Sequence, residues 1–373
     1  MKLASGRLAS LAGEAWRQAG DERERIPALA TELAGFGGSG ISRNGLAEGE
    51  AASWRDTVFS RSVSLTLLAG SGSRWQASLA AARSEGRLSG AQLAFDAEAP
   101  RGLFPVKNFL HAEASSTLPI AAYSLAAVAG LGSHAIVIRD HEAEIRRDII
   151  GALGLRQEEW RFTIQEAPFG KPLGHGDAAW QSRALWRDAD WVVTNFGGDA
   201  NSRFTVEASL LALAALDAAG EGTDFLLPAA LLREPAYPIE LDDAGRPLSF
   251  GHAKLQGHAL GADRGPGWMG LANVGLRLYR ASALAALLEE LHDTYWLEGK
   301  GYAIPGNAPG NPEFALDNAD AVFASRGRAR VLAIAREREL SPAKSFDELP
   351  GFEAAIAEVL AEDYSRGSGR ASW

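Results

Sequence analysis

The alternation of short apolar runs with helical patterns is the feature that most constrains the fold of this chain. Apolar runs at residues 62–68, 135–138 and 191–194 have the length of buried strands. Helical patterns at residues 120–129 and 177–186 precede the second and third runs. Strands that alternate with helices imply a mostly parallel sheet covered on both faces. We therefore predict an α/β fold, with a three-layer αβα Rossmann-like core and a mixed, mostly parallel sheet.

The rest of the chain extends this pattern at both ends. Further strands are predicted at residues 237–241, 248–250, 274–279 and 330–335, and further helices at residues 281–291 and 352–362. These patterns indicate three parts: a helical N-terminal extension (1–60), a core (61–292) in which we expect the chemistry to lie, and a C-terminal segment (293–373) with a closing helix, which we expect to complete the site.

Composition excludes several classes of chemistry and partner. The chain has no cysteine, so it has no disulfide, thiolate metal cage or cysteine nucleophile. Its formal net charge of -10 argues against a nucleic-acid partner, because binding to a phosphate backbone needs clustered cations. No apolar run reaches membrane-spanning length, and residues 1–26 mix charges among apolar side chains. We expect a cytoplasmic protein without a signal peptide or a membrane partner.

A glycine-rich turn directly after the first apolar run is the sharpest local signal. It reads Ala69, Gly70, Ser71, Gly72, Ser73, Arg74. Glycines let backbone amides approach phosphate oxygens closely, and Arg74 would add a permanently charged planar fork. The turn lacks the lysine of a P-loop and the spacing of a dinucleotide fingerprint. The alternative is an ordinary strand-to-helix turn.

A glycine-glycine-aspartate step, Gly197 to Asp199, follows the third apolar run. A carboxylate at the carboxyl end of a strand can hold Mg²⁺ that bridges phosphates, and small residues such as Gly198 leave room for the ligand. The alternative for Asp199 is a helix N-cap.

These segments, with several others in the same order over residues 62–349, resemble the nucleoside-triphosphate transferase family. The resemblance is to its sugar-1-phosphate nucleotidyltransferases, in the branch of UDP-sugar and UDP-N-acetylhexosamine pyrophosphorylases, and so to a nucleotide-diphospho-sugar transferase-like fold. The other matching segments are Pro-Arg-Gly-Leu-Phe-Pro-Val at 100–106, Gln-Glu-Ala at 165–167, Pro-Leu-Gly-His-Gly-Asp at 172–177, the hairpin at 238–254, Asn273 in Ala-Asn-Val-Gly, and Ser-Pro-Ala-Lys at 341–344.

The resemblance implies a set of cations around the phosphates. Arg74 and Arg101 would neutralise phosphate charge, and Arg101 stands at the lysine position of the family, with Lys107 as a possible stand-in. Lys254 would lie near the sugar phosphate, although His252 and Ala253 replace the usual acidic residue before it. Lys344 would neutralise charge where bacterial relatives place a second metal ligand.

The resemblance also implies the groups that bind the ligands. Ala69, Gly70 and Gly72 would contact the phosphates, and Asp199 would hold Mg²⁺. Gln165 and Gly174 would contact the nucleobase edge, and Asn273 the sugar hydroxyls. Alternative interpretations are a capping or packing role for His175 and a turn-forming role for Asn273.

The predicted function is a pyrophosphorylase that joins a nucleoside triphosphate, expected to be UTP, to a sugar 1-phosphate and releases pyrophosphate. Both partners are small molecules, and positioning with charge neutralisation would carry the reaction. One alternative is a nucleotidyltransferase with another acceptor, such as an alcohol phosphate. Another is a non-catalytic nucleotide- or sugar-binding relative. A hydrolase is disfavoured, because the seven histidines are scattered and no Ser/His/Asp order is found.

Overall fold

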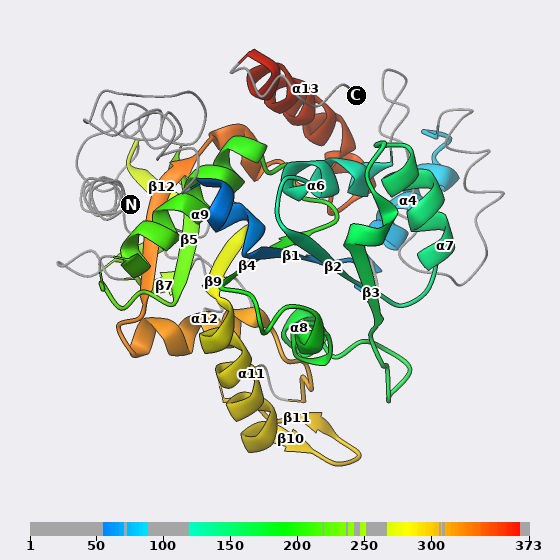
Figure 1. The fold of residues 1–373 in the computed structure, drawn as a ribbon. Coiled ribbons are helices and arrows are strands. Elements are labelled where there is room, and N and C mark those ends of the chain that lie inside the picture. The colour runs from blue at the N-terminus through cyan, green and yellow to red at the C-terminus, as the bar shows by residue number, and fades with distance from the viewer. Residues whose placement is uncertain are drawn as a thin grey trace.

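A computed structural model describes residues 55–70, 73–88, 119–218, 220–235, 238–241, 247–250, 267–305, 307 and 310–365. Within these residues a ten-stranded mixed sheet forms the centre of the fold (Figure 1). The strand order is β3-β2-β1-β4-β9-β5-β8-β6-β7, and β12 pairs with β5. The predicted α/β fold with a mixed, mostly parallel sheet is confirmed.

Four parallel strands make up one half of the sheet. They are β3 (Trp160–Ile164), β2 (Ser133–Ile138), β1 (Ser62–Leu67) and β4 (Trp191–Phe196). All six residues of β1 are buried, as expected for a strand with a neighbour on each side and helices on both faces.

The other half of the sheet mixes directions. β9 (Arg277–Arg280) runs antiparallel between β4 and β5 (Phe225–Arg233), and β12 (Ala329–Ala335) runs parallel to β5. The antiparallel strands β8 (Met269–Asn273), β6 (Ile239–Leu241) and β7 (Pro247–Phe250) extend this half.

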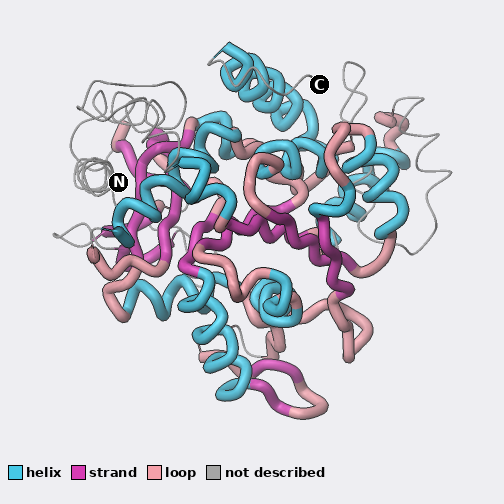
Figure 2. Tube along the Cα trace, in the orientation of Figure 1, coloured by secondary structure: helices cyan, strands magenta, loops and turns pink. Residues whose placement is uncertain are grey.

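Helices cover both faces of the sheet (Figures 1 and 2). Ile136 and Ile138 of β2 pack into the cluster that contains α6 (Ile120–Val128), the π-helix η3 (Ile145–Gly151) and α9 (Arg203–Ala218). Ala135 and Val137 of the same strand face α8 (His175–Gln181), α11 (Ala281–Tyr295) and α12 (Leu316–Ser325). The period-2 alternation of strand side chains therefore separates the two cores.

Smaller elements lie around these layers. Helices α4 (Ser73–Ser84) and α13 (Leu349–Ser365) share a third cluster built on Trp75, Tyr123 and Phe352. A hairpin of β10 (Trp296–Leu297) and β11 (Gly301–Tyr302) follows α11. The short helices are α7 (Glu142–Glu144), η4 (Gln157–Glu159), η5 (Arg183–Leu185), η6 (Glu337–Leu340) and η7 (Phe346–Glu348).

Several predicted boundaries are wrong. The helix predicted at 281–291 ends at Tyr295, and the one predicted at 352–362 spans Leu349–Ser365. The helix predicted at 177–186 begins at His175 and ends at Gln181, where the short helix η5 follows. The strand predicted at 274–279 begins only at Arg277, because Gly275 takes a positive φ of 87° and turns the chain. Several elements were not predicted: strands β3, β5, β8, β10 and β11, helices α4, α9 and α12, and the π-helix η3. The predicted N-terminal helical extension lies almost entirely outside the described residues.

A buried histidine of β2 makes stability depend on pH. His134 is 2% exposed, stacks on Trp160 with ring centroids 4.0 Å apart, and shares a 2.8 Å hydrogen bond between its Nδ1 and the Ser64 Oγ. Burial lowers the pKa of His134 from 6.5 to about 4. Between pH 6.5 and about pH 4, His134 is therefore protonated in the unfolded chain but neutral in the native state.

We predict that the free energy of unfolding falls by up to about 3 kcal/mol through this histidine as the pH drops through that window. His134→Gln keeps a polar partner for Ser64 but does not titrate, so its stability should fall less over the same range. Urea unfolding at several pH values measures both slopes. Identical slopes for the two proteins would contradict the assignment.

Candidate functional site

The order of the parallel strands places a topological switch point between β1 and β4. The chain goes from β1 to β2 and β3 on one side, and then returns to pair β4 with the other edge of β1. In open α/β sheets, ligands bind outside the carboxyl ends of the strands at such a point. Leu67 pairs with Phe196, so the segments after both residues leave the sheet at the same level. The glycine-rich turn that begins at Ala69 and the Gly-Gly-Asp step at 197–199 thus begin side by side.

A chain of buried hydrogen bonds supports this edge. Thr66 Oγ1 donates to Asn195 Oδ1 at 2.8 Å, and Asn195 Nδ2 donates to the Ser124 carbonyl at 2.8 Å. Ser124 Oγ in turn donates to the Asp199 carbonyl at 3.0 Å. The two central strands, α6 and the loop of Asp199 are therefore joined through polar groups that satisfy one another.

The Asp199 carboxylate lies against a glycine. Asp199 is 6% exposed, and a Cβ atom added to Gly275 would come 2.5 Å from its Oδ2. Asn201 Nδ2 donates to the Val274 carbonyl at 3.0 Å, and Gly275 N donates to Asn273 Oδ1 at 2.8 Å. Asn273 is thus near Asp199, and its side chain forms the turn that brings Gly275 to the carboxylate.

The Ser-Pro-Ala-Lys run at 341–344 reaches the same loop. Ala343 N donates to the Gly198 carbonyl at 2.8 Å, which places the exposed Lys344 beside the Gly-Gly-Asp step. Glu339, 1% exposed, anchors the run at the start of α9: its carboxylate accepts from Ser202 N at 3.0 Å and from Thr205 Oγ1 at 2.7 Å. Burial raises the pKa of Glu339, and these hydrogen bonds oppose the shift.

Gln165 and Gly174 are brought together after the end of β3. Gln165 is buried, and its Nε2 donates to the Gly174 carbonyl at 3.0 Å and to Asp177 Oδ2 at 2.8 Å. Gly174 has a φ of 99° and its α-carbon faces the Phe314 backbone so closely that a side chain would collide with it. Gln165 follows Ile164, which pairs with Ile138 at the end of β2. Gln165 therefore lies at the carboxyl ends of the parallel strands, as the glycine-rich turn does.

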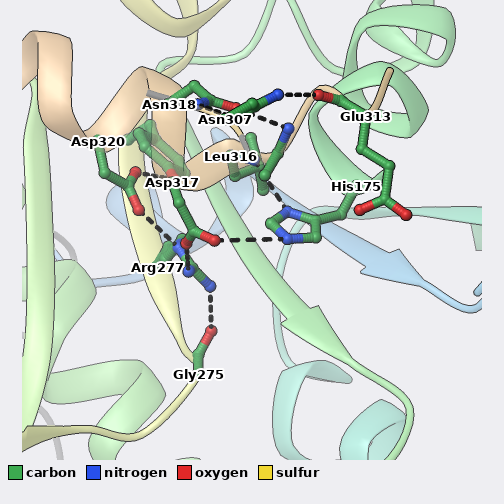
Figure 3. A network of polar contacts seen from close by, with 11 residues as sticks. His175, Gly275, Arg277, Asn307, Glu313, Leu316, Asp317, Asn318 and Asp320 are labelled. Atoms are coloured by element: carbon green, nitrogen blue, oxygen red, sulfur yellow. Dashed lines mark hydrogen bonds and ion pairs between the residues drawn. The ribbon is translucent and has the colours of Figure 1, made fainter. Parts of the chain in front are cut away.

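His175 serves as a capping residue in this structure. Its Nδ1 accepts a 2.9 Å hydrogen bond from the backbone N of Leu316, the first residue of α12. Its ring also contacts Phe196 edge-on, with centroids 5.3 Å apart. His175 Nε2 lies 3.8 Å from Asp317 Oδ2 (Figure 3).

A buried arginine links α12 to the Gly275 turn (Figure 3). Arg277 is 3% exposed and donates to Asp320 Oδ2 at 2.8 Å, to Asp317 Oδ1 at 2.5 Å, and to the Gly275 carbonyl at 3.0 Å. Burial opposes the charge of Arg277, but the two carboxylates outweigh it, so its pKa is raised. Burial raises the pKa of Asp320, against the pull of Arg277.

This network was missed in the sequence. The signals that point to it are an arginine in a strand otherwise buried and two aspartates three residues apart in one helix, at 317 and 320.

The described site residues converge at one edge of the sheet. They are Ala69, Gly70, Gln165, Gly174, Gly198, Asp199, Asn273 and Lys344. Arg74 belongs to the first turn of α4, and its side chain is not among the described ones. Gly72, Arg101 and Lys254 lie outside the described residues, so their placement stays a prediction.

Asp199 suits a magnesium ion that arrives with phosphates better than one held by protein alone. Among the described residues, no group of three or more His, Asp or Glu side chains is arranged to hold a metal. Mg²⁺ keeps several waters and is usually bound by one or two carboxylates together with substrate phosphates. A single carboxylate at a strand end, packed closely against Gly275, fits that mode.

A hollow of about 340 Å³ lies elsewhere, and its lining includes Ser62, Ser133 and Asp190. These residues stand at or just before the starts of β1, β2 and β4, which is the opposite edge from the site. Arg61 and Asp190 form an ion pair of 2.8 Å there. The strand-end argument rather than this hollow therefore defines the candidate site.

No protein-family model matches the chain, and no curated protein matches its sequence. In the part of the chain that the structure describes, no helix is long and apolar enough to cross a membrane.

We predict that Arg277→Met lowers the free energy of unfolding by about 3–5 kcal/mol, because it leaves two buried carboxylates without their cation. Arg326→Met is the matched control: Arg326 forms an exposed 2.6 Å pair with Glu290 and should cost less than about 1 kcal/mol. Chemical denaturation measures both variants. Equal decreases in the free energy of unfolding would contradict the prediction that the buried ion pairs of Arg277 stabilise the fold more than an exposed pair does.

We predict that Gly275→Ala displaces the Asp199 carboxylate. Gly327→Ala is the matched control, because Gly327 also has a positive φ, 66°, but a Cβ atom at that position would meet nothing within 4 Å. Both variants bear the backbone cost of about 1 kcal/mol, whereas only the first also collides with Asp199. Thermal unfolding should therefore show a larger loss for Gly275→Ala; equal losses would rule out the collision.

Proposed function

We propose that this protein is a sugar-1-phosphate nucleotidyltransferase, which forms a nucleoside diphosphate sugar from a nucleoside triphosphate, with UTP expected, and releases pyrophosphate. The observation that carries the proposal is the convergence of separately predicted segments at the switch point. The turn at Ala69 and Gly70, the step at Gly198 and Asp199, and the run that ends at Lys344 lie far apart in sequence and meet at one sheet edge.

The described residues would act mainly by position and charge. Backbone amides of the glycine-rich turn would face the phosphates, and Lys344 would place a flexible ammonium near them. The sugar phosphate is already ionised at neutral pH, so its oxygen can attack the α-phosphorus in line without a strong base. The bond that forms joins that oxygen to the α-phosphorus, and the bond that breaks releases pyrophosphate.

Asp199 is the residue that would hold Mg²⁺, which when bound neutralises charge on the phosphates. The buried bonds behind it serve this role, because Ser124 holds the Asp199 carbonyl and the Gly275 turn limits the carboxylate on one side. Arg74, Arg101 and Lys254 are proposed to complete the cationic set, and Asn273 to contact the sugar.

The second candidate is a non-catalytic nucleotide- or sugar-binding protein of the same fold. It is favoured by the positions where the segments depart from the family, Arg101 and His252. It is also favoured by Asn273, whose Oδ1 is engaged by its own turn.

Pyrophosphate release from the purified chain tests the proposal. Four ribonucleoside triphosphates are combined with hexose and N-acetylhexosamine 1-phosphates in the presence of Mg²⁺. We expect one pair to react, and Asp199→Asn to lower the rate by about 100-fold or more. Asp190→Asn is the matched control, because Asp190 precedes the other end of β4 and pairs with the exposed Arg61, so the rate should change little.

Nucleotide binding by calorimetry separates the two candidates. Binding without pyrophosphate release from any pair would favour the non-catalytic protein. Release that does not depend on Asp199 would contradict the assignment of that residue.

A further inference from the structure

Asp177 is the centre of a buried cluster that joins three elements. The residue is 2% exposed, and its carboxylate accepts three hydrogen bonds. Gln165 Nε2 and Gln181 Nε2 each donate to Oδ2 at 2.8 Å, and the Tyr302 hydroxyl donates to Oδ1 at 2.9 Å. The donors come from the end of β3, from α8 and from β11. All three are satisfied at once by an ionised carboxylate, which only accepts.

The partners of Gln165 determine which way its amide points. Its nitrogen faces the Gly174 carbonyl at 3.0 Å and the Asp177 carboxylate, and both are acceptors. A flipped amide would place oxygen against two oxygens and leave both without a donor. The first acceptor is held in place by its neighbours, because Phe314 N donates to the Leu173 carbonyl at 2.7 Å and Gly176 N donates to the Phe314 carbonyl at 2.9 Å.

Gln181 does not offer Gln165 an alternative. Its own oxygen accepts from Glu166 N at 2.7 Å, which turns its nitrogen toward Asp177. Two glutamine nitrogens therefore meet one carboxylate oxygen, and neither amide can flip without losing two hydrogen bonds.

The consequence is a one-sided hydrogen-bonding group at the site. Both hydrogens of the Gln165 amide are used inside the protein, and its oxygen accepts no hydrogen bond from any residue that the structure describes. Gln165 is only 3% exposed, and buried polar atoms are almost always satisfied. The oxygen is thus available to a ligand that donates, and unsuited to one that presents a lone pair.

We propose that Asp177 is a positioning residue that orients the Gln165 amide, so that the site selects a ligand edge with an N–H donor. The inference rests on the proposed function. Within it, the edge is the imide N–H of a uracil ring, because cytosine carries a lone pair at the same ring position. The selection acts through the direction of one amide and needs no charge on the ligand base.

Dissociation constants of UTP and CTP, measured by calorimetry with Mg²⁺, test the proposal. The native chain should bind UTP about ten- to a hundredfold more tightly than CTP, because the buried Gln165 oxygen would have no hydrogen-bond donor when CTP is bound. Asp177→Leu removes the acceptor that opposes a flip of Gln165, so the preference should fall toward unity. Asp177→Asn can keep its oxygen toward the two glutamines and turn its nitrogen to the Tyr302 oxygen, so it should retain the preference.

The ratio of the two constants is the decisive readout. If Asp177 has only a structural role, Asp177→Leu will weaken the binding of UTP and CTP equally and leave the ratio of their dissociation constants unchanged. That result would overturn the proposal. Gln165→Leu removes the acceptor itself and decides the matter where Asp177→Leu does not fold: loss of the preference supports the proposal, and its retention overturns it.

Failure of the proposed function gives a different result. A native chain that binds no nucleotide contradicts the proposed function, and this inference with it. A native chain that binds UTP and CTP equally well, or CTP more tightly, overturns the orientation of Gln165 and leaves the proposed function standing.

Discussion

The hydrogen bond between Thr66 and Asn195 is the interaction on which the site depends most. It joins the two central parallel strands at a pair of residues that face one another in register, in a region with no access to water. Asn195 and Ser124 then pass this constraint to the backbone of Asp199. Polar groups at such depth cost free energy unless each has a partner, so this chain specifies one arrangement of the strand ends.

Close backbone approach is the second constraint on the site. Gly174 and Gly176 face the backbone at Phe314 and Ala315, and Gly275 faces the Asp199 carboxylate, at separations that leave no room for a side chain. These contacts bring the start of α12 onto α8 and bring the β8–β9 turn onto the loop after β4. The shape of the site therefore comes from missing side chains as much as from those present.

The site contains cations although the chain as a whole is acidic. The net charge is -10, and the buried Arg277 is neutralised by Asp317 and Asp320. That cation therefore serves the structure of the Gly275 turn and is not available to a phosphate. Lys344 lies exposed at the same edge, next to the Gly-Gly-Asp step. This distribution is consistent with the proposed function, because a small phosphorylated ligand needs only a few cations in one place.

The sequence by itself determined the fold class and marked the candidate positions for the site. Apolar runs at 62–68, 135–138 and 191–194 predicted three of the parallel strands, because strands buried on both faces are rich in apolar side chains and carry few charges. Strand β3, with exposed residues at a sheet edge, and β5, with Pro228 inside it, give weaker local signals and were missed. The boundary at Arg277 depends on the turn at Gly275, which local periodicity does not reveal.

Tertiary structure alone decided which residues meet and which way they face. Sequence order marked Gln165 and Asp199 as candidates, but not that Asp177 and Gly174 take both amide hydrogens of Gln165, or that Gly275 stands against Asp199. The sequence offered capping as one role for His175 but did not identify α12 as the helix it caps, and it gave no sign that Arg277 joins two carboxylates of that helix. The reason is physical: hydrogen-bond direction and steric fit depend on atoms that lie close in space and far apart along the chain, whereas strand and helix patterns depend on neighbours a few residues away.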